Sequence, residues 1–183
     1  DIVKVWKNQE LRLYLGIIFA STLAIAVNIS SQMGSFAKGL QHGFFQVSSI
    51  ITTTGFAAVD YDIWPEFSKT ILFLLTLIGA CAGSTGGGFK VSRLVVLFRS
   101  IRNEISQVVH PRSVKKIHMD GKIIPDGMAR SIRIYLMIYV VVYLVSFLLI
   151  SLDNFDFTTN FTAIAANLNN VGPGLNMVGP AGN

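Results

Sequence analysis

The sequence contains few of the residues on which disulfide-bonded domains and soluble enzymes depend. It has one cysteine, Cys81, and three histidines, His42, His110 and His118, which lie in separate segments. A single cysteine excludes an internal disulfide framework, and the histidines lack the spacing of a metal site. No set of nucleophile, base and oxyanion donor can be assembled from the remaining residues. We therefore expect a protein that is not an enzyme and binds no cofactor of its own.

Charged residues are also scarce, at 14% of the chain against 51% hydrophobic residues, and the mean hydropathy is +0.55. Soluble domains have a more even balance. Residues 11–30, 71–82 and 134–152 form apolar stretches, and a helix needs about 20 such residues to cross a bilayer. Buried helices of a soluble protein are the less favoured alternative, because a chain this short cannot surround three of them with polar layers. The sequence predicts an all-α, polytopic membrane protein.

The distribution of charge predicts the orientation in the membrane. Of the 15 basic residues, all but Lys38 and Lys69 lie before or at the start of the first apolar stretch, or between the second and third. Basic segments stay on the cytoplasmic side, so both regions should face the cytoplasm. The net charge of +5 follows from this arrangement, and we expect no nucleic-acid partner. The opposite side has acidic residues that either raise the local cation concentration or reflect ordinary loop composition: Asp60, Asp62, Glu66, Asp153 and Asp156.

An imperfect internal repeat organises the chain. Residues 44–56, FFQVSSIITTTGF, are echoed at an offset of 117 residues by 161–173, FTAIAANLNNVGP. The same offset places the first apolar stretch at residues 128–147, which overlap the third. Each copy is one structural unit, here a spanning helix, a short helix and a loop that contains glycine. Such loops between membrane helices are candidate selectivity filters.

Residues 38–50 form an amphipathic helix that is too short to cross the bilayer. We expect it to enter the membrane and return through residues 52–56. Unpaired backbone groups are tolerated at membrane depth only where they are buried in protein or line a water-filled cavity. This loop should therefore line a pore. Trp64 and Pro65 should begin the next helix near the outer membrane interface.

A glycine-rich segment interrupts the helix that follows. Each glycine inside a helix costs about 1 kcal/mol relative to alanine, so a regular helix should break here and resume at residues 91–101. The phosphate-binding motif of nucleotide-binding proteins requires Gly-Lys-Ser/Thr, whereas this chain has Gly88, Phe89 and Lys90. We therefore exclude a nucleotide site. The segment consists of Gly83, Ser84, Thr85, Gly86, Gly87 and Gly88.

The basic segment that follows contains a candidate β-hairpin at residues 114–124. Apolar and polar residues there flank Asp120 and Gly121, a pair that is typical of two-residue hairpin turns. The hairpin is either a docking surface for a cytoplasmic partner or a compact connector.

Three motifs resemble the Trk/Ktr/HKT superfamily of potassium transporters, and most closely its bacterial TrkH family of membrane subunits: TTTGF at 52–56, GACAGSTGGGFKVSR at 79–93 and NLNNVGPGL at 167–175. The resemblance implies four fused units of potassium-channel type, each with a helix, pore helix, filter loop and second helix, around one pore. Residues 1–110 resemble the complete third unit, 111–127 the cytoplasmic hairpin connector, and 128–183 the fourth unit through its filter loop.

The resemblance also implies the ion site and the gate. Potassium, the transported ion, would bind backbone carbonyls of Thr53, Thr54 and Gly55 in one unit and of Asn170, Val171 and Gly172 in the other. Asn169 and Asn170 would brace their loop. The segment from Gly83 to Gly88 would be the intramembrane gate loop, with a packing kink as the alternative. Alanine at Gly86, Gly87 and Gly88 should then change flux and leave the filter undisturbed.

The implied setting is potassium uptake through the bacterial cytoplasmic (inner) membrane. The full-length protein would be a homodimer in the lipid bilayer, regulated by a ring of nucleotide-binding subunits of TrkA type. Two alternatives stay open. One is a sodium-permeable or sodium-coupled member of the same superfamily, and the other is a non-conducting structural membrane subunit.

Overall fold

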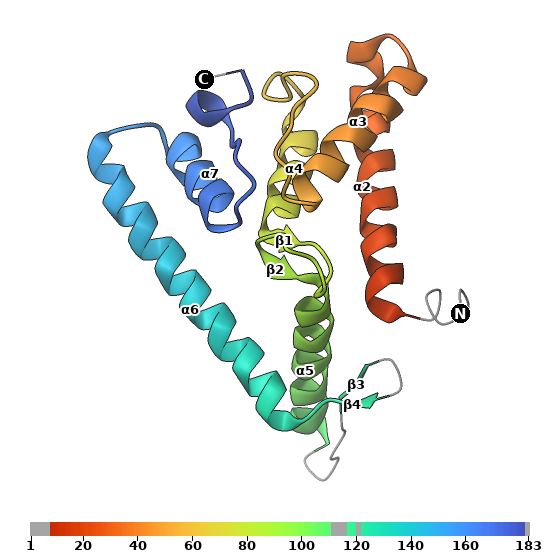
Figure 1. Cartoon of the computed structure of the whole chain (residues 1–183), viewed down its shortest axis with the longest axis vertical. Coiled ribbons are helices and arrows are strands. Elements are labelled where there is room, and N and C mark those ends of the chain that lie inside the picture. The colour runs from red at the N-terminus through yellow and green to blue at the C-terminus, as the bar shows by residue number, and fades with distance from the viewer. Residues whose placement is uncertain (1–7, 111–116, 120–121, 182–183) are drawn as a thin grey trace.

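The computed structural model describes residues 8–110, 117–119 and 122–181. Helices dominate the described chain, and Figure 1 shows α4 stacked above α5 in a central column, with α2 on one side and α6 and α7 on the other. The elements are α2 Gln9–Met33, α3 Phe36–Ile51, α4 Glu66–Leu77, β1 Ile78–Gly79, β2 Phe89–Lys90, α5 Val91–Val109, β3 His118–Met119, β4 Lys122–Ile123, α6 Asp126–Ile150, η1 Ser151–Asp153, α7 Phe157–Leu168 and η2 Asn176–Val178.

Helix α2 has clear start and stop signals. The side chain of Asn8 accepts a hydrogen bond from the amide of Leu11 at 3.0 Å, which satisfies one of the free amides of the first turn. Gly34 ends the helix in the left-handed conformation, with φ of 67°. Helix α2 and residues 127–153 are the two helical segments of the described chain that are long and apolar enough to cross a membrane. They coincide with the first and third apolar stretches of the sequence.

The short helix α3 packs closely against α2 because two glycines face it. A Cβ atom at Gly39 would lie 2.9 Å from the carbonyl oxygen of Ala26, and one at Gly43 would lie 3.3 Å from Ile25. Helix α3, of 16 residues, corresponds to the short helix predicted at residues 38–50. The buried core beneath it contains Ile25, Ile29, Val47, Ile50 and Ile51.

The central column is a broken helix. Helix α4 ends at Leu77, and β1 pairs with β2 in parallel, Ile78 with Phe89 and Gly79 with Lys90. The break predicted at the glycine-rich segment is present, although the helix ends earlier than the apolar stretch 71–82. A Cβ atom at Gly79 would lie 2.1 Å from the carbonyl oxygen of Gly87, so this early end depends on close backbone contact at a glycine.

The internal repeat is present in the backbone. Both bounds of α2, 9 and 33, become the bounds of α6, 126 and 150, when 117 is added. The last residue of α3, Ile51, becomes in the same way the last residue of α7, Leu168. The two copies differ between these helices, where α6 is followed by the 3-10 helix η1.

The predicted hairpin is also present. Strands β3 and β4 pair antiparallel, His118 with Ile123 and Met119 with Lys122. The turn predicted at Asp120 and Gly121, and residues 111–116 of the predicted connector, lie outside the described residues. In Figure 1 the hairpin lies beside α5, at the opposite end of the molecule from α3 and α7.

Candidate functional site

Two loops of matching geometry follow α3 and α7. Thr53 and Asn170, which are equivalent in the repeat, have φ of 56° and 54°. Gly55 and Gly172 are also equivalent and have φ of 79° and 112°. Residues other than glycine and asparagine rarely adopt positive φ. The left-handed conformation of Thr53 shows that both loops follow the same path even where their side chains differ.

Backbone hydrogen bonds fix this path in both copies. The amide of Thr54 donates to the carbonyl of Ser49 at 2.9 Å, and the amide of Val171 donates to that of Ala166 at 2.9 Å. The preceding amides, of Thr53 and Asn170, donate to Ile50 at 2.9 Å and Asn167 at 3.1 Å. Each acceptor in the second loop lies 117 residues after its counterpart. The carbonyl ends of α3 and α7 therefore meet their loops in the same geometry.

The two loops contact each other through glycine. A Cβ atom at Gly55 would lie 2.0 Å from the carbonyl oxygen of Val171 and 3.2 Å from Cδ of Pro173. Any side chain at this position would displace backbone. The structure thus brings together residues from both predicted filter segments, including Gly55 and Val171.

The glycine-rich segment contacts both loops. The amide of Gly87 donates to the hydroxyl of Thr53 at 3.2 Å. A Cβ atom at Gly87 would lie 2.0 Å from the carbonyl oxygen of Asn169, and one at Gly86 would lie 3.0 Å from the Thr53 hydroxyl. The expectation that alanines at Gly86, Gly87 and Gly88 leave the predicted filter loops undisturbed is therefore wrong, because the methyl group at Gly87 would collide with the second of these loops.

Asn169 has the contacts expected of a residue that braces the second loop. Its side chain is fully buried, and Nδ2 donates to the carbonyl of Ala165 at 2.7 Å and to the hydroxyl of Tyr139 at 2.9 Å. The equivalent residue in the first loop, Thr52, donates its hydroxyl to the carbonyl of Ser48 at 2.6 Å. The exposed Asn170 shapes its loop through backbone conformation, with positive φ.

Lys90 occupies the inside of the glycine-rich loop, a position that sequence reasoning missed. Its Nζ donates to the carbonyl and the hydroxyl of Ser84, both at 3.2 Å, and to the carbonyl of Gly86. A lysine two residues after a glycine run was the available signal in the sequence, but only the structure shows that Lys90 contacts these carbonyls. Glu10 was missed as well, and its carboxylate accepts from the amides of Ala82 and Ser92.

The electrostatic setting of the two loops favours a cation. The last turns of α3 and α7 contain no basic residue, so the partial negative charge at their carbonyl ends is not neutralised locally.

At the N-terminal end of α7, the Thr159 hydroxyl and amide and the Asn176 side chain donate to Asp156 and lower the pKa of its carboxyl. Asp156 therefore caps α7 and holds the loop that follows it.

Comparisons with known proteins give a consistent result. The family model TrkH, described as a cation transport protein, matches residues 11–179. The Trk system potassium uptake protein TrkH of Escherichia coli K12 is 33% identical over 175 residues, which cover 94% of this chain and 36% of that protein. TrkG of the same strain is 34% identical over 174 residues, which cover 92% and 35%.

The fold is similar as well. The crystal structure of the potassium transporter TrkH from Vibrio parahaemolyticus matches with a TM-score of 0.87 and 33% identity, over 97% of this chain and 39% of that one. The predicted fold class, repeated units in an all-α membrane protein, is confirmed by this match. The chain spans about a third of the length of the curated relatives, with 36% of the Escherichia coli protein covered.

Proposed function

The chain belongs to the TrkH family of cation transport proteins, and from this premise we propose that it supplies one complete pore unit and part of a second to a potassium uptake protein. Cation transport proteins are membrane proteins and not enzymes. The observation that carries the proposal is the contact between the two equivalent loops, in which Gly55 packs against the carbonyl of Val171. Two units meet here as neighbours around a shared axis would.

Potassium would bind at backbone carbonyls of these loops. An ion that enters a pore loses water, so oxygens must already be in place to replace that water. The repeated hydrogen bonds and positive φ angles hold two loops in one geometry, which is what a ring of equivalent carbonyls requires. The proposed ligands are Thr53, Thr54 and Gly55 with Asn170, Val171 and Gly172.

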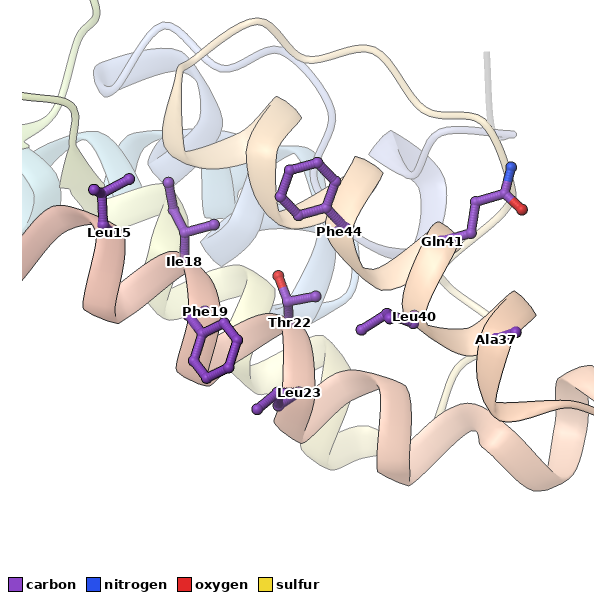
Figure 2. A pocket seen from close by; sticks show the side chains of 9 residues that line it. All are labelled: Leu15, Ile18, Phe19, Thr22, Leu23, Ala37, Leu40, Gln41 and Phe44. Carbon is purple, nitrogen blue, oxygen red and sulfur yellow. The ribbon is translucent and has the colours of Figure 1, made fainter.

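An apolar groove between α2 and α3 supports the presence of a preceding unit in the whole protein. Figure 2 shows the side chains that line this groove of about 590 Å³. Three of them are equivalent by the repeat to residues that pack against the broken helix of the preceding unit within this chain. Their counterparts are Ile132 for Leu15, Tyr135 for Ile18 and Phe161 for Phe44.

Those counterparts have specific partners. Phe161 lies 5.2 Å from Phe73 of α4, and Tyr135 lies 5.9 Å from Phe89 of β2, between ring centroids. Arg93 of α5 lies 4.5 Å from the Tyr135 ring. The groove would receive the corresponding broken helix of the preceding unit, as α6 and α7 receive α4 and α5 here.

The glycine-rich loop would be the gate of this pore. It lies between the two halves of a broken helix and contacts both filter loops through Gly86 and Gly87. Lys90 places a positive charge among its carbonyls, where it would compete with a passing cation. A packing kink alone would not require such contacts.

The setting of the whole protein is also proposed. It would lie in the bacterial cytoplasmic (inner) membrane as a homodimer, bind no cofactor itself, and be regulated by a nucleotide-binding ring of TrkA type at the hairpin of β3 and β4. The relatives are named as Trk system proteins, which supports a multi-component system.

Cation flux through the full-length protein in proteoliposomes tests the proposal. Potassium flux that exceeds sodium flux, and loses this preference on Gly55→Ser, is the expected result. Sodium flux that equals or exceeds potassium flux would favour the sodium-permeable alternative. Absence of any cation flux, with and without the regulatory partner, would favour a structural subunit.

A further inference from the structure

Side-chain hydrogen bonds connect the cytoplasmic hairpin to the base of the glycine-rich loop. Arg99 on α5 donates to the carbonyl of His118 in β3. Its Nη2 also donates to Oε1 of Gln9, the first residue of α2, at 2.7 Å. One guanidinium thus joins the hairpin, α5 and the start of α2. In Figure 1 these three elements lie together at one end of the molecule.

Glu10 continues the connection from α2 to the loop. Its Oε1 accepts from the amide of Ala82 at 2.6 Å and from the amide of Ser92 at 3.2 Å. Ala82 directly precedes the glycine-rich segment, and Ser92 lies in the first turn of α5. One carboxylate oxygen therefore binds the chain on both sides of the glycine-rich loop, at Ala82 and at Ser92. The pairing of β1 with β2 closes the loop at the same place, which we call the loop base.

These bonds are costly to break. Hydrogen bonds to an ionised carboxylate are stronger than those between neutral groups, and breaking the part-buried bond to Ser92 would leave that amide without this acceptor. The loop base cannot move away from α2 until Glu10 releases Ala82. Gln9 and Glu10 are adjacent in the first turn of α2, so a shift that Arg99 imposes on Gln9 also moves Glu10.

We propose that Arg99, Gln9 and Glu10 form a relay through which movement of the hairpin releases or fastens the glycine-rich loop. The three are positioning residues and do not contact the ion. This inference rests on the proposed function of the loop as a gate. It adds the path by which an event on the cytoplasmic surface reaches that loop, 72 residues from Glu10 to Ala82 in sequence.

Cys81 provides a reporter that does not depend on transport. It lies next to Ala82, is partly exposed, and is the one cysteine of the sequence. The full-length protein, with Cys81 as its only cysteine, is reacted with a membrane-impermeant maleimide in inside-out vesicles. Glu10→Ala should increase the labelling rate by about tenfold, which corresponds to about 1.4 kcal/mol. Arg99→Met should increase it as well.

Two control variants separate the relay from general destabilisation. Glu10→Gln keeps an acceptor oxygen but removes the charge, so it should label at a rate between those of the wild type and Glu10→Ala. Glu104→Ala removes a glutamate on α5 that contacts Arg133 and Ser100 but not the loop, and it should leave Cys81 labelling unchanged.

A double-mutant cycle gives the deciding result. Residues in one network have effects that do not add, whereas independent residues add. A double variant Glu10→Ala, Arg99→Met that labels no faster than Glu10→Ala supports the relay. Two outcomes would overturn the relay. In one, the increase in labelling rate of the double variant equals the product of the two single-variant increases. In the other, Glu10→Ala labels at the wild-type rate. Potassium flux is measured in parallel to keep the two proposals apart. If the wild type conducts potassium but the variants show no change in Cys81 labelling, the relay is rejected. If the variants change Cys81 labelling but the wild type conducts no potassium, the proposed function is rejected.

Discussion

The amide of Gly87 donates a hydrogen bond to the side-chain hydroxyl of Thr53, with 3.2 Å between nitrogen and oxygen. This bond joins the glycine-rich loop to the first proposed filter loop, 34 residues earlier in the chain. The two loops are therefore in direct contact, and changes in either should affect the other.

Thr53→Val should release the glycine-rich loop at Gly87, because valine has the shape of threonine and lacks the hydroxyl. A neutral hydrogen bond contributes about 0.5–1.5 kcal/mol, which corresponds to a change of about two- to tenfold in the population of the released loop. Potassium flux in proteoliposomes should rise accordingly. Thr53→Ser keeps the hydroxyl and should behave like the wild type. Equal flux in all three proteins would show that this bond does not hold the loop.

Gly55→Ala should reduce the potassium to sodium permeability ratio more than Gly172→Ala does. Both residues have positive φ, where a side chain costs about 1–3 kcal/mol. Only Gly55 also faces backbone, since a Cβ atom there would lie 2.0 Å from the Val171 oxygen, whereas the space beside Gly172 is open. Permeability ratios measured under bi-ionic conditions test the ranking. A larger effect at Gly172 would contradict the contact between the loops as the cause.

Gly87→Ala should impair both flux and selectivity, whereas Gly83→Ala should change neither. A Cβ atom at Gly87 would lie 2.0 Å from the Asn169 oxygen, and one at Gly83 meets nothing within 4 Å. The pair compares the same substitution at two positions of one loop. Melting temperatures in detergent establish whether each variant folds. Unchanged selectivity in a folded Gly87→Ala protein would speak against the contact with the second proposed filter loop.

Lys90→Met should increase potassium flux and leave the potassium to sodium ratio unchanged. Methionine keeps the apolar stem but removes the ammonium that binds Ser84 and Gly86, and bonds of a charged group contribute about 1.5–3 kcal/mol each. The loss also removes a positive charge that repels a passing cation. Lys38→Met, near the start of α3, removes a lysine outside the loop and serves as the control. Reduced flux in Lys90→Met would indicate that Lys90 supports an open loop.

The stability of the second unit should fall in acid through Asp156. The Thr159 hydroxyl and amide and the Asn176 side chain lower the pKa of Asp156 below its usual value in the folded protein. A carboxyl whose pKa is lowered on folding stabilises the protein above its unfolded pKa, and this contribution disappears as the pH falls through the folded value. The melting temperature of the wild type should therefore drop below about pH 4.

Asp156→Asn provides the control for this prediction, because asparagine caps helices as well as aspartate does but does not titrate. Its melting temperature should lack this part of the acid dependence. Identical pH profiles for the two proteins would assign the acid sensitivity to other carboxyls.

Local patterns predicted most of the elements correctly. The apolar stretches predicted α2 and α6, the Gly-rich run predicted a broken helix, and residues 114–124 predicted a hairpin. The offset between residues 44 and 161 predicted a repeat that the bounds of α2 and α6 follow. These features depend on hydrophobicity, glycine content and turn residues, which act over short segments of chain.

The partners of Glu10, Lys90 and Arg99 could not be predicted in this way. Each is a charged residue near the predicted cytoplasmic side, where such residues are common. Their roles depend on which backbone groups are left without partners when a helix breaks, and on which helix lies beside that break. Sequence spacing carries no information on contacts such as that between Glu10 and Ala82.

The sequence by itself determined that this chain is a repeated helical membrane unit, because burial in lipid requires apolar length and internally paired backbone. Only the tertiary structure decided that the loops after α3 and α7, the proposed filter loops, contact each other and the glycine-rich loop. Gly55 and Gly87 face carbonyls of residues far along the chain, at Val171 and Asn169. Such close contact between backbone segments depends on how the helices pack. A glycine in the sequence allows the contact, but it does not indicate which residue will lie against it.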